Sequence, residues 1–235
     1  MLVTEPNPRL TDIVKAAVDG GVDIVHWRDK STVGVDRAEL ACRLRGIVHS
    51  PSLFFVNGDP EIAKLVGADG LHLPENGMPV GQARLIAGEG IMIGRSIHSV
   101  DAARRAEREG ADYIVAGTIF ASKSHANRPG AGLEFLTEVC QAVSIPVVAI
   151  GGVTPENAGG CLRAGASGVA VLSPIMNAGD PDDAARMYRT ALDAVACLRG
   201  TAQLSTISLI PVPSPSSLIL RWEKGVQWSS AAEDL

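Results

Sequence analysis

The feature that most constrains this chain is a repeated unit in which a short apolar segment is followed by an amphipathic helix. Eight such units occupy about the first 200 of the 235 residues. The apolar segments are rich in Val and Ile and mostly apolar on both faces, which is typical of parallel strands covered by helices. We expect strands at Leu2–Thr4, Asp23–Arg28, Leu53–Val56, Asp69–Leu73, Ile91–Gly94, Asp112–Ala116, Pro146–Ile150 and Gly168–Leu172.

Helices are expected between these strands, and glycines mark several of their ends. A glycine stands two or three residues before three of the apolar segments, at Gly67, Gly110 and Gly165. At such a position glycine supplies the left-handed conformation that ends a helix. The expected helices are Arg9–Asp19, Asp36–Val48, Pro60–Val66, Val80–Ala87, Val100–Glu109, Leu133–Val143, Pro155–Ala164 and Asp180–Leu198.

Right-handed crossovers between parallel strands leave two architectures, a closed (β/α)8 TIM barrel or an open doubly wound sheet. No G-x-G-x-x-G motif follows the first strand, which disfavours a dinucleotide-binding sheet. We therefore expect an α/β chain with a (β/α)8 barrel over residues 1–200. Residues 201–235 contain prolines and serines without periodicity, and this composition predicts a disordered C-terminal tail.

Charge and composition exclude several classes of partner. The net charge is −5, from 21 basic and 26 acidic residues, and no basic run is present, so nucleic acid is not an expected ligand. No stretch of eighteen apolar residues and no leader sequence occurs, which predicts no membrane partner. The four cysteines form no C-x-x-C pair, so zinc and dithiol sites are not indicated and a reducing cytoplasm is expected. The oligomeric state stays open, a homo-oligomer included.

In a barrel of this kind the functional groups lie at the carboxyl ends of the strands. On the second strand, His26, Arg28 and Lys30 share one face, because side chains alternate along a strand. Two cations and an imidazole at a strand end predict a site for a phosphorylated or carboxylated ligand. The alternative is a pair of surface cations beside a packed histidine.

The segment after the fifth strand contains a second candidate ligand group. Gly94 allows close approach of the backbone, and Ser96 offers a hydroxyl and an N–H to an oxyanion. Ser99 is expected to cap the following helix, and His98 to make a local contact rather than act as a catalyst.

The longest connection, residues 117–132, is rich in hydroxyls and bases and predicts a lid that closes over an anion. A disordered loop is the alternative. The candidate ligand groups in this connection are Thr118, Ser122, Ser124 and His125.

Phosphate binding is predicted at the last two strands. Gly151 and Gly152 follow the seventh strand, and Ser173 begins a short helical turn after the eighth. Backbone N–H groups in these two loops form the usual phosphate site of such barrels.

These residues carry a family likeness that spans residues 1–198. The segments His26–Lys30, Gly94–His98, Gly151–Thr154 and Val169–Ser173 resemble those of thiamine phosphate synthases and their relatives, the thiazole tautomerases. The resemblance implies a (β/α)8 barrel that binds a phosphorylated thiazole at the loops after the seventh and eighth strands.

The synthase branch joins hydroxymethylpyrimidine diphosphate to the thiazole phosphate and releases pyrophosphate. Its pattern after the third strand begins with an asparagine, here Asn57, which is a candidate substrate-binding residue. An aspartate follows it and another stands near the fourth strand, and together these carboxylates hold Mg²⁺. Gly58 and Gly77 stand there in this chain, with Asp59 and Glu75 as candidate substitutes. The lid also lacks the usual lysine, and His26 replaces a glutamine.

The tautomerase branch resembles the chain in two of these departures, since it lacks the metal carboxylates and has a His-x-Arg pattern on the second strand. Its proposed catalytic histidine corresponds to Thr118, which leaves His26 first and His125 second as acid/base candidates. We therefore expect a tautomerase-like isomerase without a metal or other cofactor.

Three alternatives stay open at this point. One is a synthase (a transferase) that uses Mg²⁺, and another is a non-catalytic protein that binds a thiamine precursor. The most distant alternative is a different phosphate-binding barrel, such as a sugar-phosphate epimerase.

Overall fold

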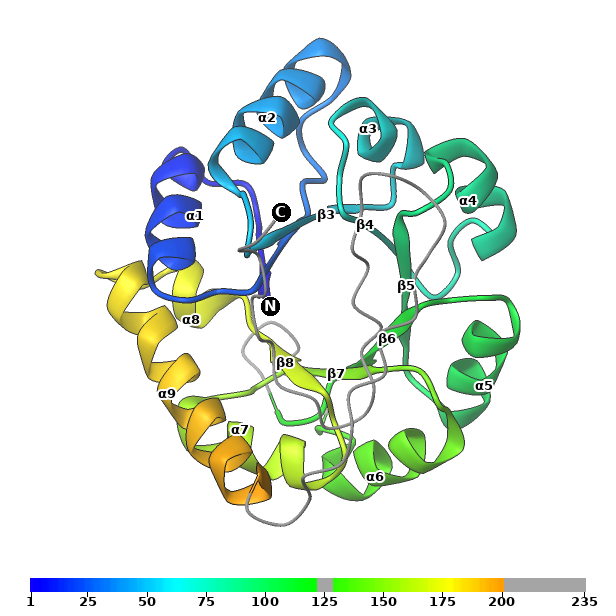
Figure 1. Cartoon of the computed structure of the whole chain (residues 1–235), viewed down its shortest axis with the longest axis vertical. Coiled ribbons are helices and arrows are strands. Elements are labelled where there is room, and N and C mark those ends of the chain that lie inside the picture. The colour runs from blue at the N-terminus through cyan, green and yellow to red at the C-terminus, as the bar shows by residue number, and fades with distance from the viewer. Residues whose placement is uncertain (122–128, 201–235) are drawn as a thin grey trace, which may run out of the picture.

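The computed structural model describes residues 1–121 and 129–200, in which helices surround a ring of parallel strands (Figure 1). The eight strands neighbour one another in chain order. They are β1 (Leu2–Val3), β2 (Ile24–Trp27), β3 (Leu53–Asn57), β4 (Gly70–Leu73), β5 (Met92–Ile97), β6 (Tyr113–Gly117), β7 (Val147–Ile150) and β8 (Gly168–Ala170).

The sheet closes on itself where the end of β8 meets β1. Val3 N donates to Val171 O at 2.8 Å, and Val171 N donates to Met1 O at 3.0 Å. Leu2 and Val171 also form a parallel bridge. Closure leaves no free sheet edge, so the predicted (β/α)8 barrel is confirmed and the open doubly wound sheet is excluded.

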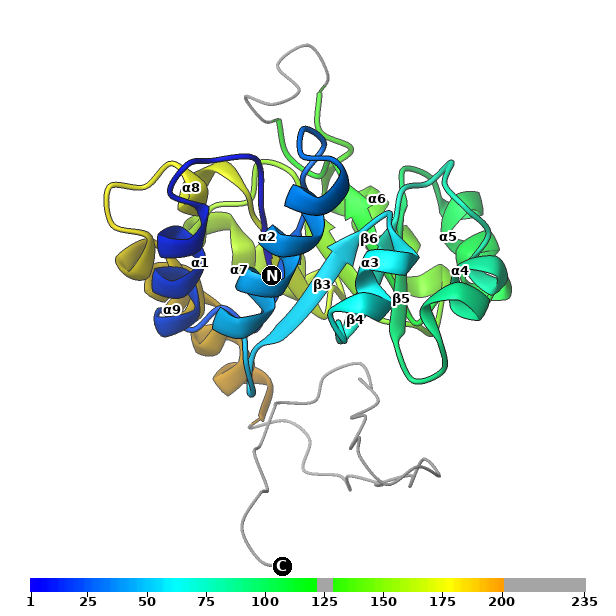
Figure 2. The same ribbon diagram turned by 90° about the horizontal axis from the view of Figure 1, so that it is seen from above.

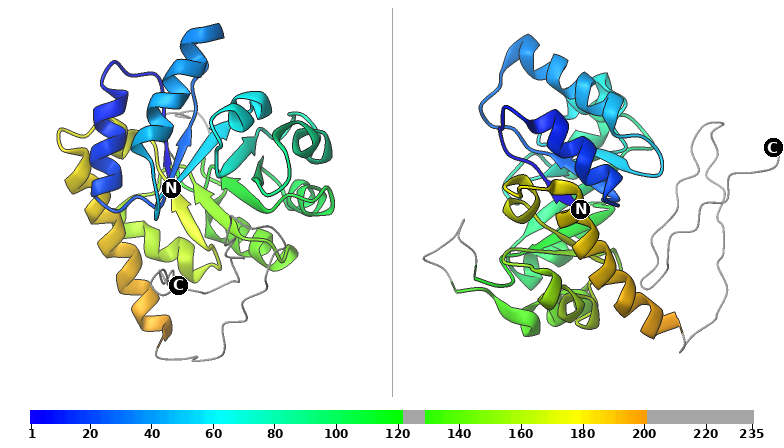
Figure 3. Two further views of the ribbon diagram at one scale, coloured as in Figure 1. Left: turned by 45° about the horizontal axis from the view of Figure 1, so that its top comes forward. Right: turned by 90° about the vertical axis from the view of Figure 1, so that its left-hand side faces the viewer.

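Helices cover the outside of the ring. α8 is the short turn predicted after the last strand, and α9 packs against α1 and α7 (Figure 3). The segment 201–235, predicted to be a tail, lies outside the described residues. The helices are α1 (Leu10–Asp19), α2 (Gly34–Ile47), α3 (Pro60–Leu65), α4 (Val80–Ala87), α5 (Val100–Arg108), α6 (Gly132–Ala142), α7 (Pro155–Arg163), α8 (Ser173–Met176) and α9 (Pro181–Gly200).

Both faces of the strands are buried, which explains why they read as apolar throughout. Trp27 and Phe54 point outward and belong to the shell between strands and helices. Phe55 and Tyr113 point inward, and their ring centroids lie 5.5 Å apart inside the barrel. The inner shell consists of Val3, Phe55, Tyr113, Val115, Val148 and Ala170.

β5 is longer than the sequence predicts, because it continues past Gly94 to Ile97. Gly94 pairs with Tyr113 and Ile97 with Ala116, so the ladder with β6 is unbroken. A Cβ atom at Gly94 would lie 2.0 Å from Cζ of Tyr113. This glycine therefore makes room for the ring of Tyr113 instead of ending the strand, and Ser96 lies within the strand.

The predicted helix ends are confirmed where glycines precede strands. Gly67, Gly110 and Gly165 have φ values of 60°, 87° and 106°. Ser99 caps α5, since its Oγ accepts from Ala102 N at 3.1 Å. In the described part of the chain, no helix has the length and apolar character needed to cross a membrane.

Candidate active site

The parallel barrel brings the predicted ligand groups to one end, because the carboxyl ends of parallel strands meet there. Figure 2 shows this end as the upper edge, where the β3 arrow points and α8 lies. The groups assembled there are Arg28, Lys30, Asn57, Ser96, Thr118, Gly151, Gly152 and Ser173. The lid candidates Ser122, Ser124 and His125 lie outside the described residues.

His26 is buried in the mouth of the barrel, with 4% of its surface exposed. Its Nε2 donates to Oδ1 of Asn57 at 3.1 Å. Its Nδ1 is also buried and has no hydrogen-bond partner among the described residues. This nitrogen is therefore a buried acceptor without a hydrogen-bond donor, which carries an energetic cost.

The electrostatic environment of His26 favours the neutral imidazole. Burial lowers the pKa of His26 to about 4, the hydrogen bond to Asn57 opposes this shift, and the nearby charge of Arg28 adds to it. A general acid or base works best with a pKa near the operating pH. His26 is therefore better suited to hydrogen bonding than to the proton transfer that the sequence predicts for it.

His72 on β4 lies beside His26, and the sequence did not predict it as a site residue. His26, His72, Ser96 and Tyr113 are called the histidine cluster below. Its side chain is 2% exposed, and its ring centroid lies 4.7 Å from that of His26. Nε2 lies 2.8 Å from Oγ of Ser96, and Nδ1 lies 3.1 Å from the hydroxyl of Tyr113. Both partners are hydroxyls that donate or accept, so either neutral tautomer of His72 is satisfied.

Burial lowers the pKa of His72 well below its usual value, and the charges of His26 and Arg95 lower it further. Burial also raises the pKa of Tyr113 well above 10, with a smaller contribution from Asp112. The imidazoles of His26 and His72 and the hydroxyl of Tyr113 in the histidine cluster are therefore neutral at pH 7. A single histidine in an apolar strand, such as His72, is usually interpreted as a core residue. The one signal for a role in the site is that His72 lies two residues after Gly70 and so on the same, inward face of β4.

The loops after β6 and β7 are packed closely together. Gly151 and Gly152 have φ values of 100° and 61°, which favour glycine. A Cβ atom at Gly151 would lie 2.4 Å from Cγ2 of Thr118, and one at Gly152 would lie 2.4 Å from the carbonyl oxygen of Ala121. The predicted phosphate loop therefore has no room for a side chain at position 151 or 152.

The family resemblance implies a Mg²⁺ ion, which would need carboxylate ligands near this end of the barrel. No group of three or more His, Cys, Asp or Glu side chains that could hold a metal ion occurs in residues 1–121 and 129–200. Asp59 Oδ1 accepts from Ile62 N at 3.0 Å, and Oδ2 lies 3.5 Å from Nε of Arg37.

Glu75 is also engaged, since its Oε2 lies 2.6 Å from Nδ1 of His98. His98 thus makes the local contact predicted for it. A Cβ atom at Gly77 would lie 2.9 Å from the ring of Pro74, where an aspartate side chain would begin. The described residues do not fit a Mg²⁺ ion held by a pair of carboxylates, and the expectation of metal independence stays a prediction.

Comparison with known proteins decides the family. A family model described as thiamine monophosphate synthase matches residues 1–175. The chain belongs to the thiamine monophosphate synthase family. The thiamine-phosphate synthase of Methanoculleus marisnigri is 44% identical over 186 residues, which are 78% of this chain and 88% of that protein. The one of Natronomonas pharaonis is 41% identical over 189 residues, which are 79% and 88% of the two chains.

A solved member of the thiamine monophosphate synthase family has the same fold. The thiamine phosphate pyrophosphorylase from Pyrococcus furiosus superposes with a TM-score of 0.75 at 34% identity, covering 83% of this chain and 96% of that one. The predicted family resemblance is confirmed. These relatives are named for the synthase reaction, so the tautomerase interpretation gains no support and the synthase alternative is favoured.

Proposed function

We propose that this protein is a thiamine-phosphate synthase of thiamine biosynthesis. In this reaction a bond forms between the pyrimidine methylene carbon and the thiazole nitrogen, while the bond from that carbon to the diphosphate oxygen breaks and pyrophosphate leaves. The observation that carries the proposal is the 44% identity to a named synthase over 88% of that protein's length.

The thiazole phosphate is assigned to the loops after β6, β7 and β8. The backbone N–H groups of Gly151 and Gly152 supply donors to an anion site, and Thr118 and Ser173 add hydroxyls and N–H groups. These donors are neutral N–H groups and hydroxyls, so the phosphoryl group is bound here without a cationic side chain.

The pyrimidine diphosphate is assigned to the loops after β2 and β3. Arg28 and Lys30 supply positive charge for the departing pyrophosphate, and Asn57 and Ser96 supply polar side chains around it. No step is assigned to a protein-held metal, because glycines replace the family's carboxylates at positions 58 and 77.

A reducing cytoplasm is part of the proposal. Cys42 is exposed as a free thiol, and Cys140 and Cys161 are buried free thiols. Such thiols persist where glutathione and thioredoxin keep cysteines reduced.

The test is pyrophosphate release from hydroxymethylpyrimidine diphosphate and thiazole phosphate, measured with Mg²⁺ and with a chelator. Release that needs both substrates supports the synthase. Conversion of a thiazole carboxylate phosphate without pyrophosphate release would instead support the tautomerase interpretation. Calorimetric binding of either precursor without turnover would support a non-catalytic binder.

A further inference from the structure

We propose that Arg37 is a positioning residue that ties the β2–α2 loop to the β3–α3 loop and so sets the spacing between the cations after β2 and Asn57. The inference rests on the proposed function, because that function assigns the pyrimidine diphosphate to these two loops. Sequence reasoning did not single out Arg37, which lies in the first turn of α2.

The β2–α2 loop begins with a turn built on Asp29, which is 5% exposed. Asp29 Oδ1 accepts from Ser31 N, Ser31 Oγ and Thr32 N at 2.7, 2.8 and 3.0 Å. Oδ2 accepts from Thr32 Oγ1 at 2.6 Å. Burial acts to raise the pKa of Asp29, but the hydrogen bonds from Thr32 and Ser31 outweigh it and lower the pKa to about 2.

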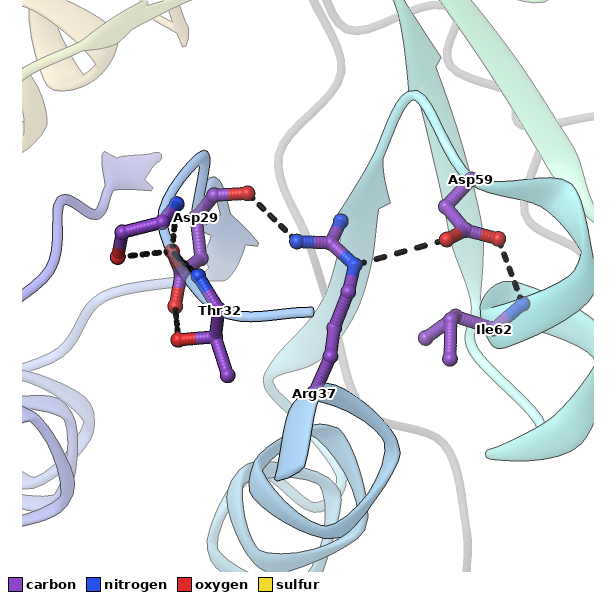
Figure 4. Close-up of polar contacts among 6 residues, drawn as sticks. Asp29, Thr32, Arg37, Asp59 and Ile62 are labelled. Carbon is purple, nitrogen blue, oxygen red and sulfur yellow. Dashed lines mark hydrogen bonds and ion pairs between the residues drawn. The ribbon is translucent and has the colours of Figure 1, made fainter. Parts of the chain in front are cut away.

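Arg37 reaches from α2 to both loops at once (Figure 4). Its Nη1 donates to the carbonyl oxygen of Asp29 at 2.6 Å, and its Nε lies 3.5 Å from Oδ2 of Asp59. The guanidinium carbon lies 4.8 Å from the ring centroid of Trp27, which is fully buried. An arginine held by three contacts from three directions is fixed in place, which a flexible lysine would not be.

Asp59 links Arg37 to the chain segment that follows Asn57. Oδ1 of Asp59 caps α3 by accepting from Ile62 N at 3.0 Å, while Oδ2 faces Arg37. The carboxylate therefore joins the start of α3 to the guanidinium. Gly58 lies between Asn57 and Asp59 with a φ of 73°, and no described atom lies within 4 Å of a Cβ built there. Position 58 therefore contributes only its backbone N–H, which donates to the carbonyl oxygen of His72 at 2.8 Å, and Arg37 and Asp59 form a side-chain link between the two loops.

This link separates two groups of ligand donors by a fixed distance. Arg28 and Lys30 flank Asp29, whose carbonyl oxygen is one end of the link, and Asn57 lies two residues from Asp59, the other end. A diphosphate that contacts both groups requires them at one spacing. Loss of the link is expected to weaken diphosphate binding while the thiazole phosphate loops on the opposite side of the barrel stay intact.

The experiment compares Arg37→Gln with Arg43→Gln, a matched control because Arg43 is exposed on the same helix. Steady-state kinetics are measured for both substrates, and pyrophosphate binding is measured by calorimetry. For Arg37→Gln we expect the KM for the pyrimidine diphosphate and the Kd for pyrophosphate to rise about tenfold. The KM for thiazole phosphate and the constants of Arg43→Gln should change less than about twofold.

Two further variants separate positioning from folding. Asp59→Asn keeps a good N-cap for α3 and removes only the charge that faces Arg37, so it should raise the same KM without a loss of helix stability. Arg37→Lys should recover part of the affinity. Combining Arg37→Gln with Asp59→Asn should cost less than the product of the single effects, because both remove one link.

The outcomes distinguish this inference from the proposed function. A wild-type protein that releases pyrophosphate, with an Arg37→Gln variant that loses only melting temperature, overturns the positioning role alone. A wild-type protein without turnover that binds pyrophosphate, and loses that binding in Arg37→Gln, supports the link although the synthase proposal fails. A wild-type protein that neither turns over nor binds pyrophosphate overturns both.

Discussion

Nε2 of His72 lies 2.8 Å from Oγ of Ser96, so an imidazole from β4 and a hydroxyl from β5 meet inside the mouth of the barrel. The two residues are 24 positions apart in the chain. Ser96, which the sequence predicts to face the ligand, thus has a protein partner as well. That partner fixes the position of the Ser96 oxygen at the mouth of the barrel.

Ser96→Ala is expected to lower the free energy of unfolding by about 1 to 3 kcal/mol, because it leaves a buried nitrogen of His72 without a partner. Denaturant unfolding measures the loss. In a double-mutant cycle, adding His72→Phe should cost less than the sum of the single effects. Strict additivity would contradict a direct contact between the two side chains.

Stability is expected to fall as the pH drops from about 6.5 to about 4 because His26 is buried in its neutral form. The folded pKa of His26 is about 4 against 6.5 for the free side chain. In this window the unfolded chain binds the proton and the folded chain does not, so acid favours unfolding. The loss from His26 reaches about 3 kcal/mol at the lower end.

Guanidinium unfolding of the wild type and His26→Gln at pH 7, 5.5 and 4.5 measures this dependence. His26→Gln should lose less stability over the range, because glutamine does not titrate. His72 contributes a loss of the same sign in both proteins, since its folded pKa is also lowered. Parallel pH profiles for the two proteins would contradict this prediction, because they would show that folding leaves the pKa of His26 unshifted.

Gly94→Ala is expected to destabilise the barrel by about 3 kcal/mol, because the new Cβ would overlap the ring of Tyr113 and overpack the interior. The distance from that Cβ to Cζ of Tyr113 would be 2.0 Å. Tyr113→Leu in the same chain should recover part of the loss, measured by thermal unfolding.

Gly46→Ala is the control for this substitution. Gly46 is exposed on α2, and no described atom lies within 4 Å of a Cβ built there. This change should stabilise the protein by up to about 1 kcal/mol through helix propensity. Equal melting temperatures for Gly94→Ala and Gly46→Ala would contradict the assigned packing.

The family's two metal-binding carboxylates correspond to Gly58 and Gly77, and restoring them one at a time should have different effects at the two positions. Gly58→Asp is expected to fold, since the space around position 58 is open and aspartate tolerates a positive φ better than most residues. Gly77→Asp is expected to lower the melting temperature, because its Cβ would press on the ring of Pro74.

Thermal unfolding with and without Mg²⁺ is the measurement. Magnesium should raise the melting temperature of Gly58→Asp by binding the new carboxylate in the folded state. The wild type should not respond, because Asp59 is committed to Arg37 and to the start of α3. A magnesium-dependent rise in the wild type would show that the existing side chains hold the ion.

Much of the fold could be predicted from local pattern. Apolar segments buried on both faces, such as Leu53–Asn57, and glycines such as Gly67 and Gly165 at helix ends specify the alternation of strands and helices. The rule that ligand groups lie at carboxyl ends then predicts Arg28 and Gly151 as ligand groups without a structure, and the family resemblance adds Asn57. Strand ends were less predictable, because β5 was expected to end at Gly94 and instead continues to Ile97, and Gly94 makes room for the Tyr113 ring of the next strand.

What the sequence by itself determined was the barrel and the family, and it also predicts that the ligand groups lie at the carboxyl ends of the strands. These follow from short-range periodicity and from motifs of a few adjacent residues. Only the tertiary structure decided that His72 joins Ser96 and Tyr113, that Arg37 joins Asp29 to Asp59, and that His26 is neutral. Such contacts depend on which strands and loops become neighbours in space and on how much water they exclude, and neither quantity is encoded in the spacing of residues along the chain.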